Sequence, residues 1–257
     1  MSFPKGFYTD DSALMICLAN SLLENGFLPS NQFDKYKKWY LEGYASATGK
    51  CYGIGQRTMK VLMGDYKDVY LMRGNEKSGG GNGALMRSVP IGLYYQGEYE
   101  KIREYGILSS YVTHNNLISG WSCVIYSALI SLIVHGIKKA ELLSSVLDLY
   151  KENIPFDLRG ILEKDYVSMS EYVGNVSGYS LNTLNIALWS FITSRSYEET
   201  IKKVILLGND TDTFAVVAGG LAGAYYGVDN INDEWINSII NKEKFLKIAK
   251  KIFKTNR

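Results

Sequence analysis

The chain has 257 residues, of which 46% are hydrophobic and 21% are charged, and its formal net charge is +2. This size allows one large buried core, and the near-balanced charge excludes a whole-protein field that would attract nucleic acid or a membrane. The 3 cysteines lie far apart and form no Cys-x-x-Cys pair, which disfavours a zinc site or a disulfide framework and is typical of the reducing cytoplasm.

Apolar residues recur at helical spacing along most of the chain. Between Ser12 and Gly26 they stand at positions 14, 15, 18 and 22, and Gly26 suits the C-cap of a helix. The same spacing predicts further helices over about 31–47, 55–64, 84–96, 98–112, 116–136, 138–151, 181–194, 197–207, 211–226 and 232–253. Pro90 should kink the third of these, and Lys202–Asp210 also fits a buried strand that enters a loop. No linker or repeat divides the chain, so the sequence predicts one compact, nearly all-α domain over residues 1–257.

The apolar and basic segments indicate whether the protein associates with a membrane and in which compartment it is located. The longest apolar run, Trp121–Val134, is shorter than the ~20 residues that span a bilayer. The first residues lack the apolar core of a signal peptide. Asn241–Arg257 is predicted to be an amphipathic helix whose lysines form a solvated outer face. We therefore expect a soluble, cytoplasmic protein with no membrane and no stable nucleic-acid partner; the sequence does not set the oligomeric state, and a monomer is compatible with it.

Thr9, Asp10 and Asp11 stand directly before the first apolar helix. Threonine and aspartate are preferred N-caps, because their side-chain oxygens accept hydrogen bonds from the free N–H groups of the first turn. One cap needs only one acid, and a second adjacent aspartate adds repulsion unless a cation relieves it. The motif therefore indicates either a helix cap or a metal site.

A second acidic motif, Asp210, Asp212 and Thr213, stands at the start of the helix predicted over 211–226. That helix is rich in glycine and alanine, which suits a close-packed central position that would direct the acids into the interior. A buried carboxylate cluster is costly without a partner, and lysine and arginine are scarce beside both motifs. Four carboxylates and two threonine hydroxyls are oxygen ligands, which suit Mg²⁺ or Mn²⁺ and not zinc.

A third polar segment, Gly79–Gly83, precedes the helix predicted over 84–96. Its backbone N–H groups can face an anion, aided by the helix dipole, although flexible glycine loops are common. The loop is neither a Walker loop nor a dinucleotide fingerprint. His114 and Tyr179 stand before two predicted helices, and core packing is the ordinary explanation for the tyrosine. His135 ends an apolar helix, where it suits a partner of the helix dipole.

With these motifs in this order, the chain resembles the ADP-ribosylglycohydrolase family. The resemblance rests on YTDDSALM, GNGALMRSVPIGL, THNN, GYSLNTLNIALWSF and GNDTDTFAVVAGGLAGAYYG, between residues 8 and 227. It implies an all-helical orthogonal bundle with two Mg²⁺ ions, or Mn²⁺ in their place, in a central cleft. The implied reaction is hydrolysis of the glycosidic bond between ADP-ribose and an acceptor, which is a protein, a nucleic acid or a small molecule.

The resemblance also implies roles for individual residues, position by position. The implied metal ligands are Thr9, Asp10, Asp11, Asp210, Asp212 and Thr213. Among these carboxylates, Asp11 is our candidate for activating the water, and Asp10 is the second candidate catalytic residue. The implied contacts to ADP-ribose are Gly81, Asn82, Gly83, His114 and Tyr179, with Met86 and Arg87 supporting the loop.

The sequence departs from the family pattern at two places. It begins too late for the helix that usually precedes the Thr-Asp-Asp motif, and Gly53 stands where an aspartate is common. We expect a more open site and slower hydrolysis from both departures. One alternative is a protein that binds ADP-ribose or a related nucleotide without turnover, and another is a structural protein of the same fold. The complete set of metal ligands argues against the structural alternative only.

Overall fold

The computed structural model describes residues 4–67 and 79–255. No strand occurs in these ranges, and one isolated antiparallel bridge joins Gly81 to Tyr179. The first helices are α1 (Asp10–Asn25), α2 (Pro29–Glu42), α3 (Gln56–Met63), the 3₁₀ turn η1 (Leu85–Arg87), α5 (Val89–Tyr94), α6 (Tyr99–Tyr111) and α7 (Leu117–Val134). They are followed by η2 (Lys139–Glu141), α8 (Leu142–Tyr150), α9 (Phe156–Leu162), α10 (Ser180–Thr193), α11 (Tyr197–Ile205), α12 (Thr211–Tyr226), η3 (Val228–Asn230), α13 (Asp233–Ser238) and α14 (Lys242–Thr255). The prediction of an all-α fold is confirmed.

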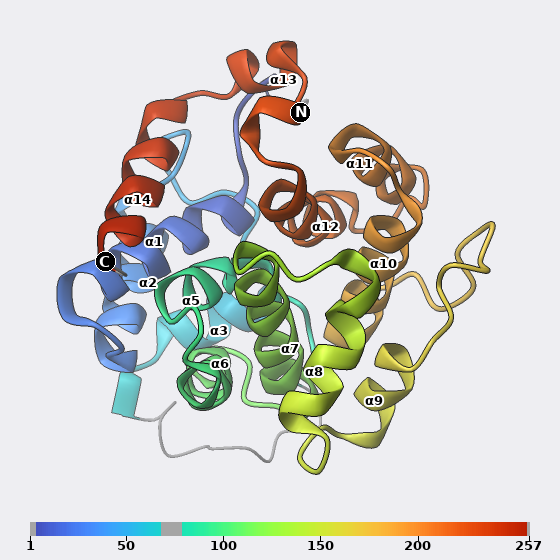
Figure 1. Ribbon diagram of the computed structural model, residues 1–257. Coiled ribbons are helices and arrows are strands. Elements are labelled where there is room, and N and C mark those ends of the chain that lie inside the picture. The colour runs from blue at the N-terminus through green and yellow to red at the C-terminus, as the bar shows by residue number, and fades with distance from the viewer. Residues whose placement is uncertain (1–3, 68–78, 256–257) are drawn as a thin grey trace.

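α7 is the central helix of the fold. Its residues from Ser119 to Ile133 are buried, and it packs against α5, α6, α8, α10 and α12 (Figure 1). Although its apolar run was expected to be too short to span a bilayer, the helix Leu117–Val134 is long and apolar enough to do so by length and composition, with a mean hydropathy of 2.0. However, 83% of it is buried inside the protein. A helix that is apolar on all sides and covered by neighbours is typical of a protein core.

Several predicted helix boundaries are wrong for local reasons. α2 stops at Glu42 because Gly43 adopts a left-handed conformation with φ 70° and closes the helix. The segment 84–96 forms η1 and α5, separated at Ser88. Pro90 does not kink a helix but lies in the first turn of α5, where its missing N–H needs no partner. Lys202–Ile205 ends the helix α11, so the strand alternative is wrong.

Three further differences concern the second half of the chain. The segment 138–151 begins with the 3₁₀ turn η2 before α8 starts. The segment 232–253 is divided into α13 and α14, because Ile239 is extended, with ψ 122°, and Asn241 has a positive φ of 55°. α9, which follows Pro155, is not among the predicted helices.

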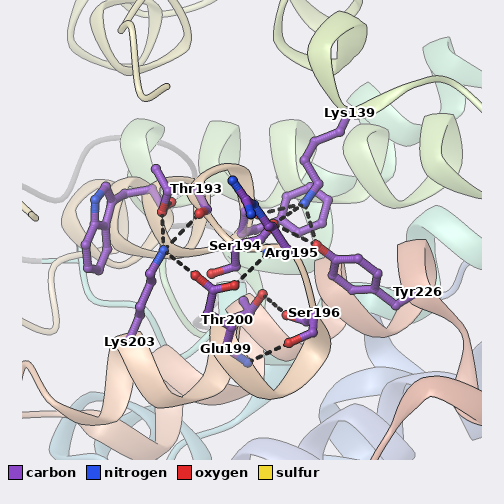
Figure 2. Close-up of polar contacts among 11 residues, drawn as sticks. Lys139, Thr193, Ser194, Arg195, Ser196, Glu199, Thr200, Lys203 and Tyr226 are labelled. Atoms are coloured by element: carbon purple, nitrogen blue, oxygen red, sulfur yellow. Dashed lines mark hydrogen bonds and ion pairs between the residues drawn. The ribbon is translucent and has the colours of Figure 1, made fainter. Parts of the chain in front are cut away.

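The C-terminal end of α10 is held by two lysine side chains from other segments, which Figure 2 shows. Lys139 Nζ donates to the carbonyl oxygens of Phe191 and Ser194, each at 2.9 Å. Lys203 Nζ donates to the carbonyl oxygen of Thr193 at 2.9 Å. The last carbonyls of a helix lack partners inside it, so the two ammonium groups satisfy them and complement the helix dipole.

Lys139→Met is expected to destabilise the protein by about 1–3 kcal/mol, because it removes three part-buried hydrogen bonds donated by a charged group. Lys139 Nζ also donates to Tyr226 Oη at 2.7 Å, so the substitution weakens three acceptor sites together, although Tyr226 Oη still donates to the Ser194 carbonyl at 2.8 Å. Thermal unfolding should show the loss as a Tm lower by roughly 2–4 °C per kcal/mol. The control is Lys138→Met at the exposed neighbouring position. Equal Tm changes in both variants would show that Lys139 does not hold α10.

Candidate active site

The two acidic motifs begin α1 and α12 without capping these helices through their side chains. Thr9 and Asp210 occupy the N-cap positions, and neither side chain makes a capping hydrogen bond. Asn116 does cap α7, since its side chain accepts from the N–H groups of Ile118 and Ser119. Helix capping therefore does not account for the acidic motifs.

Asp10, Asp11, Asp210 and Asp212 line one cavity of about 230 Å³. The other residues that line it are Gly53, Gly55, Gln56, Arg57, Thr58, Gly81, Asn82, Gly83, Met86, His114 and Thr213. The cavity therefore joins the start of α1, the segment that leads into α3, the glycine-rich loop and the start of α12. Both acidic motifs and the loop, which are far apart in the sequence, face the same space.

The acids of α1 lie deeper than the acids of α12. Asp10 is 8% exposed and Asp11 is 1% exposed. Asp210 is half-buried and Asp212 is exposed. The expectation that a central α12 directs both of its acids into the interior is therefore wrong for Asp212, which lies at the rim of the cavity.

Asp11 has one hydrogen-bonded and one unpartnered oxygen. Thr9 Oγ1 donates to Asp11 Oδ2 at 2.7 Å, whereas Asp11 Oδ1 is buried and has no partner among the described residues. Burial, opposed by the Thr9 hydrogen bond and reinforced by the charge of Asp212, raises the pKa of Asp11 from 3.8 to about 6. Burial and the charge of Asp11 raise the pKa of Asp10 from 3.8 to about 8. When both are ionised, the carboxylates of Asp10 and Asp11 therefore repel one another.

The donor chemistry of the acidic cluster fits magnesium. Within residues 4–67 and 79–255, no ion pair joins any of the four carboxylates to a lysine or an arginine. No group of three or more His, Cys, Asp or Glu side chains in these ranges is arranged to hold an ion by itself. Mg²⁺ is usually held by one or two carboxylates and keeps several water ligands. The pairs Asp10–Asp11 and Asp210–Asp212 suit such water-rich ions, and the buried, unpartnered Asp11 Oδ1 is an oxygen that a water bound to a cation would satisfy.

The glycine-rich loop is fixed to the start of α10 and to α12. The N–H group of Asn82 donates to the Gly178 carbonyl at 2.9 Å, and the N–H group of Ser180 donates to the Gly80 carbonyl at 2.8 Å. Asn82 Nδ2 donates to Asp210 Oδ2 at 2.7 Å and so orients one acid of the second motif. The element that follows the loop is the short turn η1, so the long helix dipole expected behind the loop is not formed there.

Two predicted site residues, Thr9 and Tyr179, do not line the cavity. Thr9 acts on the site through its hydrogen bond to Asp11. Tyr179 is 39% exposed and its ring lies against Gly80, where an added Cβ would stand 2.3 Å from Tyr179 Cε2. Tyr179 therefore flanks the loop at the protein surface. Arg87 supports the loop as predicted, since its Nη1 donates to the Gly83 carbonyl at 3.1 Å.

The cavity wall formed by residues 53–58 is not identified by the sequence motifs. Gly53 has a φ of +80°, and an added Cβ would lie 2.5 Å from Asp10 Oδ1. Glycine therefore meets two needs at this position, a left-handed backbone and close approach to a carboxylate. The position is noticeable in the sequence only because the related family commonly has an aspartate there.

Gly53→Ala is expected to lower activity at least about tenfold, because small displacements of site groups have large effects on rate. Gly49→Ala is the matched control: Gly49 has a φ of +72° but nothing lies within 4 Å of its added Cβ. Both variants should lose about 1 kcal/mol of stability through backbone strain. Titration calorimetry with Mg²⁺ tests whether the contact with Asp10 also matters for a cation: a weaker affinity is expected only in Gly53→Ala. Equal activity in the two variants would contradict a role for the contact with Asp10.

Comparison with known proteins points to one family. The family model described as ADP-ribosylglycohydrolase matches residues 1–257. The chain is 28% identical over 250 residues to the ADP-ribosylarginine hydrolase Tri1 of Pseudomonas putida (strain GB-1), an alignment that covers 96% of this chain and 66% of that protein. It is 28% identical over 273 residues to the ADP-ribosylhydrolase ARH3 of Mus musculus, covering 90% of this chain and 73% of that protein. A solved structure described as an ADP-ribosylglycohydrolase-related protein complex superposes with a TM-score of 0.82 at 29% identity, covering 99% of this chain and 84% of that chain.

Proposed function

Since this chain belongs to the ADP-ribosylglycohydrolase family, as its motifs predict, we propose that it hydrolyses the glycosidic bond between ADP-ribose and an acceptor. Membership places the chain among glycosidic-bond hydrolases. We propose two further points. The acidic motifs hold two Mg²⁺ ions, which Mn²⁺ can replace, and hydrolysis requires these ions.

One observation supports this proposal above the others: carboxylates from both acidic motifs and the polar loop Gly81–Gly83 face one cavity. An ADP-ribosyl substrate combines an anionic diphosphate with a ribose whose anomeric carbon bears the bond to be cleaved. Loop amides and the His114 ring suit phosphate and hydroxyl oxygens as hydrogen-bond partners. The carboxylates suit hard cations beside the ribose.

The residues of the cavity divide the chemistry between them. Bound Mg²⁺ would supply polarisation of ribose oxygens and a lowered pKa for a bound water. Asp11 would take a proton from the water that attacks the anomeric carbon, since Thr9 orients its carboxylate through Oδ2 and leaves Oδ1 unpartnered. As the new C–O bond forms, the bond to the acceptor breaks, and the acceptor would leave with the bonding electrons and gain the proton that Asp11 took from the water. Asn82 holds Asp210 in place by donating from the amide that also reaches Thr183 Oγ1 at 3.0 Å.

Arginine-linked ADP-ribose is the first acceptor class to test. Similar proteins of Pseudomonas putida and Serratia proteamaculans are named ADP-ribosylarginine hydrolases. Serine-linked ADP-ribose, ADP-ribosylated nucleic-acid bases and small ADP-ribosyl conjugates complete the panel.

The decisive experiment measures free ADP-ribose released from this panel with Mg²⁺, with EDTA, and with EDTA followed by Mn²⁺. We expect cleavage of at least one linkage with Mg²⁺, loss of cleavage with EDTA, and recovery with Mn²⁺. Calorimetric binding of ADP-ribose without cleavage of any linkage would instead establish a binding protein. Cleavage that persists in EDTA would overturn the metal requirement alone.

A further inference from the structure

Arg87 is a buried guanidinium that no carboxylate neutralises among the described residues. It is 1% exposed, and within this part of the chain it forms no ion pair. Its Nη2 donates to Thr113 Oγ1 at 2.7 Å and its Nη1 donates to the Gly83 carbonyl. Its Cζ lies 4.4 Å from the centre of the Tyr36 ring, a cation–π contact. The charge of Arg87 is thus held directly behind the glycine-rich loop.

The hydroxyl of Thr113 lies between this guanidinium and the ring of His114. Thr113 is 1% exposed, and its Oγ1 is 2.7 Å from Arg87 Nη2 and 2.9 Å from His114 Nδ1. A guanidinium has donors only, so Thr113 Oγ1 must accept from Arg87. The other contact of this oxygen among the described residues is His114 Nδ1. If Nδ1 donated to it as well, the buried hydroxyl proton would have no acceptor there, so the proton is assigned to point to Nδ1. A nitrogen that accepts this proton is unprotonated, so the ring proton of a neutral His114 sits on Nε2.

The ring of His114 is held so that its Nε2 edge meets the cavity. The N–H group of His114 donates to the Ser110 carbonyl at 2.7 Å, and its own carbonyl accepts from Ser110 Oγ at 3.0 Å. An added Cβ on Gly83 would stand 3.1 Å from His114 Nε2, and one on Gly81 would stand 3.5 Å from it. Because neither glycine has a side chain, the imidazole ring of His114 can pack directly against the loop. Burial, then the charges of Arg87 and Arg57, lower the pKa of His114 to about 3, so the ring stays neutral at working pH.

We propose that Arg87 and Thr113 are positioning residues that fix His114 as the Nε2–H tautomer, so that the ring gives the cavity a neutral hydrogen-bond donor. The ligand class it would take is an oxygen acceptor, a phosphate or hydroxyl oxygen of ADP-ribose, and this part rests on the proposed function. In this tautomer Nε2 has no lone pair to offer, so His114 serves neither as a metal ligand nor as a general base through that atom.

Nitrogen-15 NMR of the imidazole rings tests the tautomer in the ligand-free protein at alkaline pH. The chain has 2 histidines, and the second is an internal control. His135 Nδ1 lies 2.8 Å from the Ser131 carbonyl oxygen, which can only accept, so His135 should be protonated on Nδ1. His135→Gln assigns the two rings. We expect a protonated Nε2 and an unprotonated Nδ1 for His114; a protonated Nδ1 would overturn the proposal.

Thr113→Val keeps the shape of the side chain and removes the hydroxyl, and Thr113→Ser restores it. The valine variant should lose the single-tautomer spectrum of His114 and bind ADP-ribose about tenfold more weakly, the effect of one hydrogen bond. The serine variant should recover both properties. A valine variant with the wild-type spectrum and affinity would overturn the proposal; if that variant does not fold, the wild-type spectrum decides. A spectrum of the Nε2–H tautomer in a protein that does not bind ADP-ribose would support the positioning of His114 by Arg87 and Thr113, and it would reject ADP-ribose as the ligand.

Discussion

Asp11→Asn is expected to lower kcat at least about a thousandfold, the upper range for loss of a general base. The substitution keeps the shape of the side chain but removes the charge that would take a proton from water and help to hold a cation. In the wild type, Thr9 Oγ1 donates to Asp11 Oδ2 at 2.7 Å. In Asp11→Asn the amide oxygen can take the place of Oδ2 and accept the same hydrogen bond. Rates of ADP-ribose release, with the substrate identified from the panel, measure the effect.

The stability of Asp11→Asn separates loss of chemistry from loss of fold. Neutralising position 11 removes a charge that raises the pKa of Asp10, so the EDTA-treated variant should melt no lower than the EDTA-treated wild type. Asp148→Asn is the control, an exposed acid on α8 away from the cavity lining. Comparable turnover in the two variants would reject Asp11 as the catalytic carboxylate.

Removing divalent cations is expected to lower the Tm by roughly 5 °C or more at pH 8, and by less at pH 5.5. The pKa values of Asp10 and Asp11 rise to about 8 and about 6 in the folded, metal-free protein, above the 3.8 of an ordinary aspartate. The folded protein thus binds more protons than the unfolded chain between about pH 4 and 8, so these groups make the metal-free protein less stable as pH rises. Protons and cations compete for the same oxygens, so the stabilisation by Mg²⁺ should grow with pH.

Differential scanning calorimetry of wild type and Asp10→Asn, each with EDTA and with excess Mg²⁺, measures this prediction. Asp10→Asn should remove most of the pH dependence of the difference between the two conditions. Asp148→Asn should retain it. A wild-type Tm that is unaffected by EDTA across the pH range would count strongly against a metal site at the acidic motifs.

The all-α fold was predictable from the sequence because helices leave a periodic pattern of apolar residues. The placement of the two acidic motifs near each other was predictable as well. Apolar spacing over 116–136 predicted the helix α7, and its burial from Ser119 to Ile133 is a finding of the structure. The two acidic motifs were unusual because each has more acids than a cap needs, and the structure places both beside one cavity. The roles of individual residues in binding ADP-ribose came from the family resemblance, because local sequence patterns do not indicate them.

The features that sequence reasoning missed, or noticed without a structural reason, depend on tertiary contacts. Gly53 is required by an approach of 2.5 Å between its absent Cβ and Asp10 Oδ1, a distance set by the packing of a loop on α1. The Thr113 hydroxyl is placed by a buried guanidinium on η1, and nothing in the local sequence indicates that contact. The boundary at Asn241 depends on a positive φ that apolar periodicity does not encode. Asp212 is exposed because the start of α12 reaches the rim of the cavity, although the rest of that helix has a buried face.

The most direct test of the central claim, that the two acidic motifs hold metal ions, is anomalous diffraction from a crystal soaked in Mn²⁺. Data collected at the manganese absorption edge locate these ions independently of any assumption about the site. We predict two peaks in the cavity, about 3.5–4 Å apart, in contact with carboxylate oxygens of Asp10 or Asp11 and of Asp210 or Asp212. A cavity with no anomalous peak at saturating Mn²⁺, or peaks confined to other parts of the surface, would contradict it.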